Sequence, residues 1–168
     1  MITLHEISDL TTYKNALYDT IKRIEEKQVE LAPYVDPNGI PSIGIGFNLR
    51  DSYVRQAVFD TLGIVDASIQ QQLTNTINAT YAPGDNSALQ SALGASFRFS
   101  SETEVRTTFN KIIGRYESRL DARLGGTPIL NSFERIALVS LVYQSTNNIT
   151  NEFIRAYRAG DRAEVLRT

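Results

Sequence analysis

The most informative stretch of this 168-residue chain reads Arg23-Ile-Glu-Glu-Lys-Gln-Val-Glu-Leu-Ala-Pro-Tyr-Val-Asp-Pro-Asn-Gly-Ile-Pro-Ser-Ile-Gly-Ile-Gly-Phe47. It begins at the end of a segment with helical spacing, in which apolar residues recur every three or four positions. Residues 31 to 47 then mix prolines and glycines with tyrosine, valine and isoleucine, a composition that favours a small twisted sheet over a helix. The Asp36-Pro-Asn-Gly sequence predicts a turn, and residues 40 to 45 predict the returning strand.

Most of the remaining chain has the spacing of helices. Asp51 and Asp66 are each followed by apolar residues at helical intervals and predict two helix starts, and Ser101 predicts a third. Residues 136 to 143 form the most apolar run, which predicts a central helix buried on most of its circumference. No stretch reaches the roughly 20 apolar residues of a transmembrane helix. We therefore expect one mainly helical α+β domain with a small antiparallel sheet near residues 31 to 47.

The composition disfavours several kinds of function. The chain has 17 Lys and Arg against 19 Asp and Glu, so the broad cationic surface of nucleic-acid binders is missing. It has no cysteine, which excludes thiolate metal sites and cysteine nucleophiles. His5 is the only histidine, which leaves no multi-histidine metal site. Any catalysis is expected to use carboxylates.

The quoted stretch places acids where glycoside hydrolysis could use them. Glu26 stands ten positions before Asp36 (36 − 26 = 10), and Ser42 follows on the returning strand. A glycosidase needs two carboxyl groups on opposite sides of the sugar, one protonated and one ionised. The same residues also suit a solvated helix end and an ordinary turn, so their spacing leaves both interpretations open.

The sequence of residues 23 to 49 resembles that of the phage lysozymes of the T-even type. The resemblance rests on Arg-Ile-Glu-Glu followed by Pro-Tyr-Val-Asp-x-x-Gly-x-x-Ser-Ile-Gly-Ile-Gly-Phe-Asn-Leu. In that family a Glu ends the first helix, and Tyr-x-Asp, a turn glycine and Thr-Ile-Gly-Ile-Gly-His-Leu complete the site. The match continues weakly through residues 101 to 110 and 133 to 144, whereas residues 51 to 100 show little similarity to the family.

The resemblance implies a lysozyme-like fold of two lobes over residues 1 to 168, with the substrate groove between them. The small lobe would cover about residues 25 to 65, and the helical lobe residues 1 to 24 and 66 to 168. The family continues with further helices beyond the equivalent of Leu166. We therefore expect a chain that continues after Thr168, or a partner or second copy that covers the C-terminal apolar face of an otherwise monomeric protein.

The resemblance also implies roles for individual residues. Glu26 would be the general acid, Asp36 would position or activate the water, and Ser42 would replace the family's threonine. Three residues would line the saccharide site: Tyr34, Gly44 and Gln144.

The chain departs from the family pattern at two points in this segment. The family separates its Glu and Asp by one residue less, so an insertion near residues 32 and 33 is needed to bring Glu26 into register. Glu25 and Glu30 therefore remain alternatives for the acid. Phe47 stands where the family has a histidine, which removes a stabilising polar contact.

The activity implied is hydrolysis of the β-1,4 bond between N-acetylmuramic acid and N-acetylglucosamine in peptidoglycan, without a cofactor. The alternatives are a lytic transglycosylase acting on the same bond and a non-catalytic relative that binds the cell wall. The N-terminus has no signal-peptide pattern, so synthesis in the host cytoplasm and action in the periplasm are expected. An endolysin, a virion-borne lysozyme and a secreted antibacterial effector all remain open.

One further pattern lies outside that segment. Arg115, Arg119 and Arg123 recur every four residues and are predicted to line one face of a helix. Such a face is either simply solvated or a cationic rim that meets an anionic wall polymer.

Overall fold

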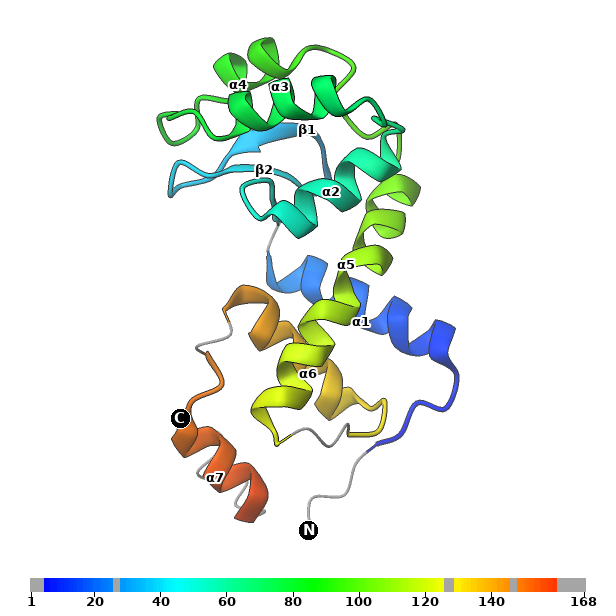
Figure 1. The fold of residues 1–168 in the computed structure, drawn as a ribbon. Helices are drawn as coiled ribbons and strands as arrows, with labels where there is room; N and C mark the ends of the chain where they lie inside the picture. The colour runs from blue at the N-terminus through cyan, green and yellow to red at the C-terminus, as the bar shows by residue number, and fades with distance from the viewer. Residues whose placement is uncertain (1–4, 26–27, 126–128, 146–147, 160–168) are drawn as a thin grey trace. The chain divides into compact units, whose positions relative to one another are not determined.

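The computed structural model describes residues 5–25, 28–125, 129–145 and 148–159. In chain order its elements are α1 (Leu10–Ile24), β1 (Glu30–Val35), β2 (Pro41–Gly44), β3 (Phe47–Asn48), α2 (Ser52–Thr61), α3 (Ala67–Ile77), α4 (Asn86–Leu93), α5 (Glu102–Arg123), α6 (Phe133–Gln144) and α7 (Asn151–Ala159) (Figure 1). The described part is mainly helical with one small antiparallel sheet, which confirms the predicted α+β class. None of its helices is long and apolar enough to cross a membrane.

The chain divides into two compact units. The first, here called the sheet unit, is Glu25–Ile112, and the second, the helical unit, combines Met1–Ile24 with Ile113–Thr168. The sheet unit therefore extends well past residue 65, where the small lobe was expected to end, and it includes α3 and α4. The unit includes α4 because this helix covers the open edge of β1.

The sheet has the strand order β1-β2-β3, with both pairs antiparallel. Tyr34 on β1 is paired with Ser42 on β2, which is paired in turn with Asn48 on β3. Between β1 and β2 the chain reverses at the predicted turn, where the backbone N of Asp36 donates to the carbonyl of Ile40 (3.0 Å). The three short strands thus form a meander whose two turns fall at residues 36 to 39 and 44 to 47.

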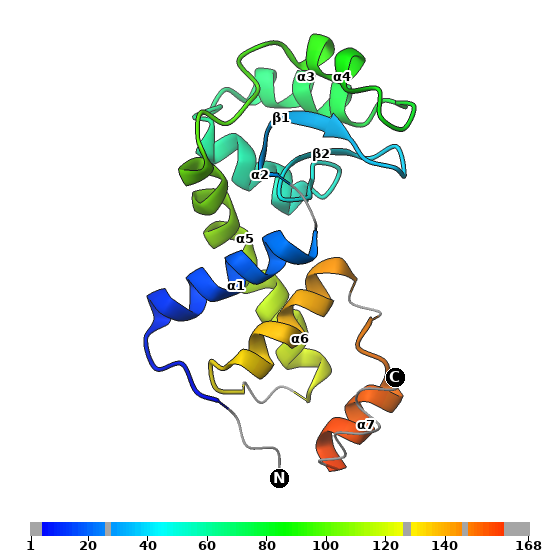
Figure 2. The same cartoon turned by 180° about the vertical axis from the view of Figure 1, so that it is seen from behind.

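The outer edge of β1 is covered by α4 and its flanking loops (Figures 1 and 2). Four backbone groups of this edge have partners outside the sheet: Leu31 O accepts from Phe99 N (2.8 Å), Pro33 O accepts from Gln90 Nε2 (2.9 Å), Val35 N donates to Asn86 Oδ1 (2.8 Å), and Val35 O accepts from Gly84 N (3.3 Å). Pro33 has no N–H to satisfy, so an edge position suits it. The side chains of α4 thereby replace a fourth strand, and unpaired edge groups are avoided.

Several helix starts follow the sequence signals. Asp51 and Asp66 are the N-caps of α2 and α3, and their carboxylates accept from backbone N–H groups of the first turn, as predicted. At the start of α5 the carboxylate of Glu104 accepts from Ser100 N (2.7 Å).

The helical unit is built around α6, whose apolar run is largely buried, as predicted. Arg135 on this helix keeps only 6 % of its side chain exposed and binds Asp121 on α5 through two hydrogen bonds of 2.7 and 3.1 Å. Burial disfavours the charged guanidinium, but the hydrogen bonds and charge of Asp121 outweigh it and raise the pKa of Arg135. On α1, the hydroxyl of Tyr13 donates to Glu117 of α5 (2.9 Å), and Glu117 lies 3.7 Å from the Arg135 guanidinium. This polar network joins α1, α5 and α6.

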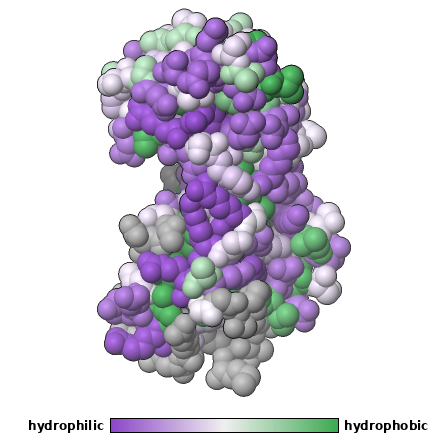
Figure 3. All heavy atoms as spheres, viewed as in Figure 1, coloured by the Kyte–Doolittle hydropathy of each residue, from purple (hydrophilic) through white to green (hydrophobic). Residues whose placement is uncertain are grey.

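The segment before α1 is tied to the start of α6. His5 donates its backbone N–H to Glu134 Oε2 (3.0 Å), and its ring Nδ1 lies 2.7 Å from Glu134 Oε1. Ile7 N also donates to the carbonyl of Asn131 (2.7 Å). His5 thus anchors the N-terminal segment at an exposed position. Elsewhere, hydrophilic residues cover most of the surface visible in Figure 3.

This anchor predicts a pH-dependent contribution to stability. The hydrogen bonds from His5 lower the pKa of Glu134 to about 2, below the ordinary value of 4.5. The ionised carboxylate therefore stabilises the fold fully above pH 4.5, and this contribution is lost as the pH falls from 4.5 through 2. Melting temperatures from pH 6 down to pH 2 should show wild type more stable than Glu134→Gln at pH 6 and the difference shrinking toward pH 2. A difference that does not depend on pH would contradict this assignment.

Candidate functional site

Asp36 shapes the first turn of the sheet with one of its two carboxylate oxygens. Its Oδ1 accepts from the backbone N–H groups of Asn38 and Ile40, both at 2.8 Å. No described residue bonds to the second oxygen, Oδ2, and the side chain is half-buried. Asp36 is therefore a turn former, as its sequence context suggests, and it also offers one carboxylate oxygen to a water or a ligand.

Ser42 is connected to the same turn. It is buried, and its Oγ donates to the carbonyl of Ile40 at 3.3 Å. The N–H of Ile40 is the group that Asp36 holds, so residue 40 links the carboxylate and the hydroxyl through its two backbone groups. Tyr34, the strand partner of Ser42, is also buried. The structure thus brings together three of the predicted site residues at one end of the sheet.

Gly44 begins the second turn, and its role in the structure is in packing. Its φ of +71° favours glycine, and a Cβ atom at this position would lie 2.8 Å from the ring of Phe47 and 3.2 Å from Val105. Phe47 is buried and meets Phe99 edge to face, with ring centroids 6.4 Å apart. The Phe47 side chain therefore adds to the core. Contact between Gly44 and a saccharide stays a prediction.

Two of the three candidate acids lie among the described residues. Glu25 is half-buried, and a Cβ atom built on Gly46 would lie 3.4 Å from its Oε2, so this carboxylate lies over the second turn of the sheet. Glu30 is the exposed first residue of β1. Glu26 lies outside the described residues. The sequence kept Glu25 as an alternative acid, but spacing alone could not place its carboxylate over the second turn.

Gln144, the remaining predicted substrate residue, is the exposed last residue of α6. It belongs to the helical unit, whereas Asp36, Ser42, Tyr34 and Gly44 belong to the sheet unit. Among the described residues, no group of three His, Asp or Glu side chains is arranged to hold a metal ion.

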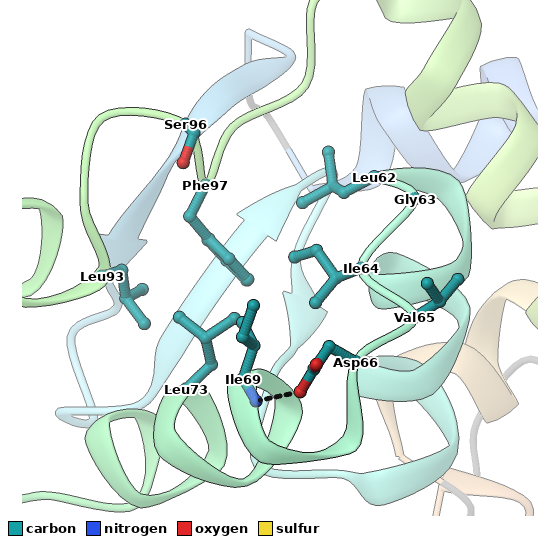
Figure 4. A pocket seen from close by; sticks show the side chains of 10 residues that line it. All are labelled: Leu62, Gly63, Ile64, Val65, Asp66, Ile69, Leu73, Leu93, Ser96 and Phe97. Carbon is teal, nitrogen blue, oxygen red and sulfur yellow. Dashed lines mark hydrogen bonds between the residues drawn. The ribbon is translucent and has the colours of Figure 1, made fainter.

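A hollow in the sheet unit lies away from these residues. It has a volume of about 440 Å³ and lies between the loop from α2 to α3 and the loop after α4. Figure 4 shows the side chains of Ile64, Ile69, Leu73 and Phe97 around it. Val65, Ile69 and Leu73 recur every four residues, a spacing that could have indicated this apolar face from the sequence. The hollow contains neither the predicted acids nor Ser42, so we do not assign catalysis to it.

No protein-family model, curated protein or solved structure matches this chain.

The packing at Gly44 predicts an unequal response of two glycines to alanine. Gly63 has a similar φ of +69° but no atom within 4 Å of an added Cβ, so Gly63→Ala should cost only the backbone strain of about 1–2 kcal/mol. Gly44→Ala carries the same strain and also displaces the Phe47 ring, which adds about 1–3 kcal/mol. Urea unfolding of both variants measures the difference. Equal losses would show that the Phe47 ring does not depend on the glycine.

Proposed function

We propose that this chain is a peptidoglycan-degrading glycoside hydrolase, a muramidase that cleaves the β-1,4 bond between N-acetylmuramic acid and N-acetylglucosamine. The single observation that carries the proposal is the turn at Asp36, where a carboxylate with one uncommitted oxygen and the hydroxyl of Ser42 are joined through Ile40. The resemblance of residues 23 to 49 to T-even phage lysozymes supplies the substrate. A lysozyme-like arrangement of two lobes and a role in bacterial cell lysis are part of the same proposal.

The Oε2 atom of Glu25 lies close to Gly46 at the second turn of the sheet, so we assign the general acid to Glu25, one of the alternatives that the sequence left open. In the reaction this acid gives its proton to the bridging oxygen as the bond from that oxygen to the anomeric carbon breaks. Gly46, which has no side chain, leaves the acid room beside the strand.

The second half of the reaction falls to Asp36 and Ser42. Oδ2 of Asp36 accepts a proton from a water whose oxygen attacks the anomeric carbon, and the Ser42 hydroxyl orients that water. One water is consumed, Glu25 becomes ionised and Asp36 becomes protonated until solvent exchange restores both. An uncommitted carboxylate oxygen at this position favours hydrolysis over transglycosylation, which uses no attacking water.

Replacing each candidate acid by its amide tests the assignment. We expect Glu25→Gln to abolish lysis of purified peptidoglycan, at least about 100-fold, because an amide cannot donate the proton. Glu26→Gln should keep most of the activity, and it is the matched control because it makes the same change one residue away. Lysis measured by turbidity, with melting temperature as the check on folding, separates the two. Full activity in Glu25→Gln with loss in Glu26→Gln would return the acid to Glu26.

Replacing Asp36 by asparagine tests the catalytic role of its carboxylate while the fold is preserved. The side-chain amide introduced by Asp36→Asn still has a carbonyl oxygen that can accept from the backbone of Asn38 and Ile40, so this variant should unfold at nearly the wild-type temperature. It should nevertheless lose most activity, because the water has no base. Asp85→Asn, which changes the N-cap of α4, is the matched control and should remain active. A rate near wild type in Asp36→Asn would rule out the two-carboxylate mechanism.

A further inference from the structure

The two sides of α5 within the helical unit carry opposite charges. Glu117 and Asp121 are four residues apart and both face the Arg135 network, in which Asp121 forms the two direct hydrogen bonds. Arg119 lies between them in sequence, and at about 100° per residue it is roughly 200° away from each around the helix. The carboxylates are therefore used inside the unit, and the Arg119 side of the helix is left cationic.

On that side, Arg119 and two aromatic rings form one continuous surface. The Arg119 guanidinium lies over the ring of Tyr116, 5.5 Å from its centroid, and the rings of Tyr116 and Tyr143 are 4.9 Å apart. All three side chains are partly exposed. No carboxylate pairs with Arg119 anywhere in the described part of the chain. We call these three residues the arginine–tyrosine platform.

The chemistry of the platform suits a sugar that has a substituent with a carboxylate. An aromatic ring presents an apolar face to the C–H groups of a sugar ring, and its amphipathic character is common in binding surfaces. A guanidinium binds a carboxylate through two parallel hydrogen bonds, and stacking on Tyr116 limits the orientations of this one before a ligand arrives. Gln144, exposed and next to Tyr143 in sequence, adds an amide that can bond to an acetamido group.

We propose that the arginine–tyrosine platform binds the glycan strand of peptidoglycan, with Arg119 on a free carboxylate of the peptide that the muramic acid carries and the two tyrosines against the sugar. This inference rests on the proposed function, since it names a binding surface for the same polymer. The net charge of the chain is −2, so the platform is a local recognition surface and not part of a general cationic field.

Binding to insoluble peptidoglycan tests the platform without catalysis. In an Asp36→Asn background, Arg119→Gln should weaken co-sedimentation by about tenfold, the scale of a lost charged hydrogen bond. Arg123→Gln removes the same charge one turn further along α5 and should change affinity less than about twofold. Tyr143→Leu, which keeps apolar volume but removes the ring, should also weaken binding while the melting temperature stays near that of the parent.

A second ligand, which has no carboxylate, tests whether Arg119 acts through the carboxylate of the wall polymer. A soluble chitin oligosaccharide has the same acetylated sugar but no carboxylate, so Arg119→Gln should leave its affinity unchanged by calorimetry. Equal weakening of wall binding by Arg119→Gln and Arg123→Gln, or none by Arg119→Gln, would overturn the platform. The outcome for the proposed function is separate: wall binding that depends on Arg119 in a protein that never lyses the wall would support the platform and contradict the hydrolase.

Discussion

The sheet unit depends on the contact between the ring of Phe47 and the backbone of Gly44. The ring occupies the space that any side chain at position 44 would need, and it meets the ring of Phe99 edge to face. This contact fixes the turn between β2 and β3 and so the register in which Ile43 is paired with Phe47. A slip of one residue would turn every side chain of β2 to the opposite face, and Ser42 would lose its position.

The same sheet has an edge that would otherwise be open, and its protection explains why the unit is larger than expected. Asn86 and Gln90 satisfy backbone groups of β1 with their side chains, from positions more than 50 residues away in sequence. Carboxamides can donate and accept, so two polar side chains on one face of a short helix serve a strand edge well. The helix that carries these two side chains, α4, therefore packs against the sheet and is part of the same unit.

Local signals predicted much of this structure. The turn at Asp36, the N-caps at Asp51 and Asp66 and the buried helix α6 depend on neighbouring residues, and the sequence contains that information. The Arg135 network and the contacts of α4 with the edge of β1 could not be predicted in this way. Each joins segments that are far apart in the chain, through contacts that no spacing rule anticipates. The candidate site divides in the same way: the Asp36 turn was predictable, whereas the position of Glu25 near Gly46 joins residues that no spacing rule brings together.

The central claim is that water attacks the anomeric carbon of muramic acid with help from Asp36. Digestion of purified peptidoglycan in water enriched in oxygen-18, followed by mass spectrometry of the released muropeptides, tests it most directly. The account predicts one heavy oxygen at the reducing-end muramic acid of each new product. Products with an anhydro ring and no heavy oxygen, or no released muropeptides at all, would contradict it.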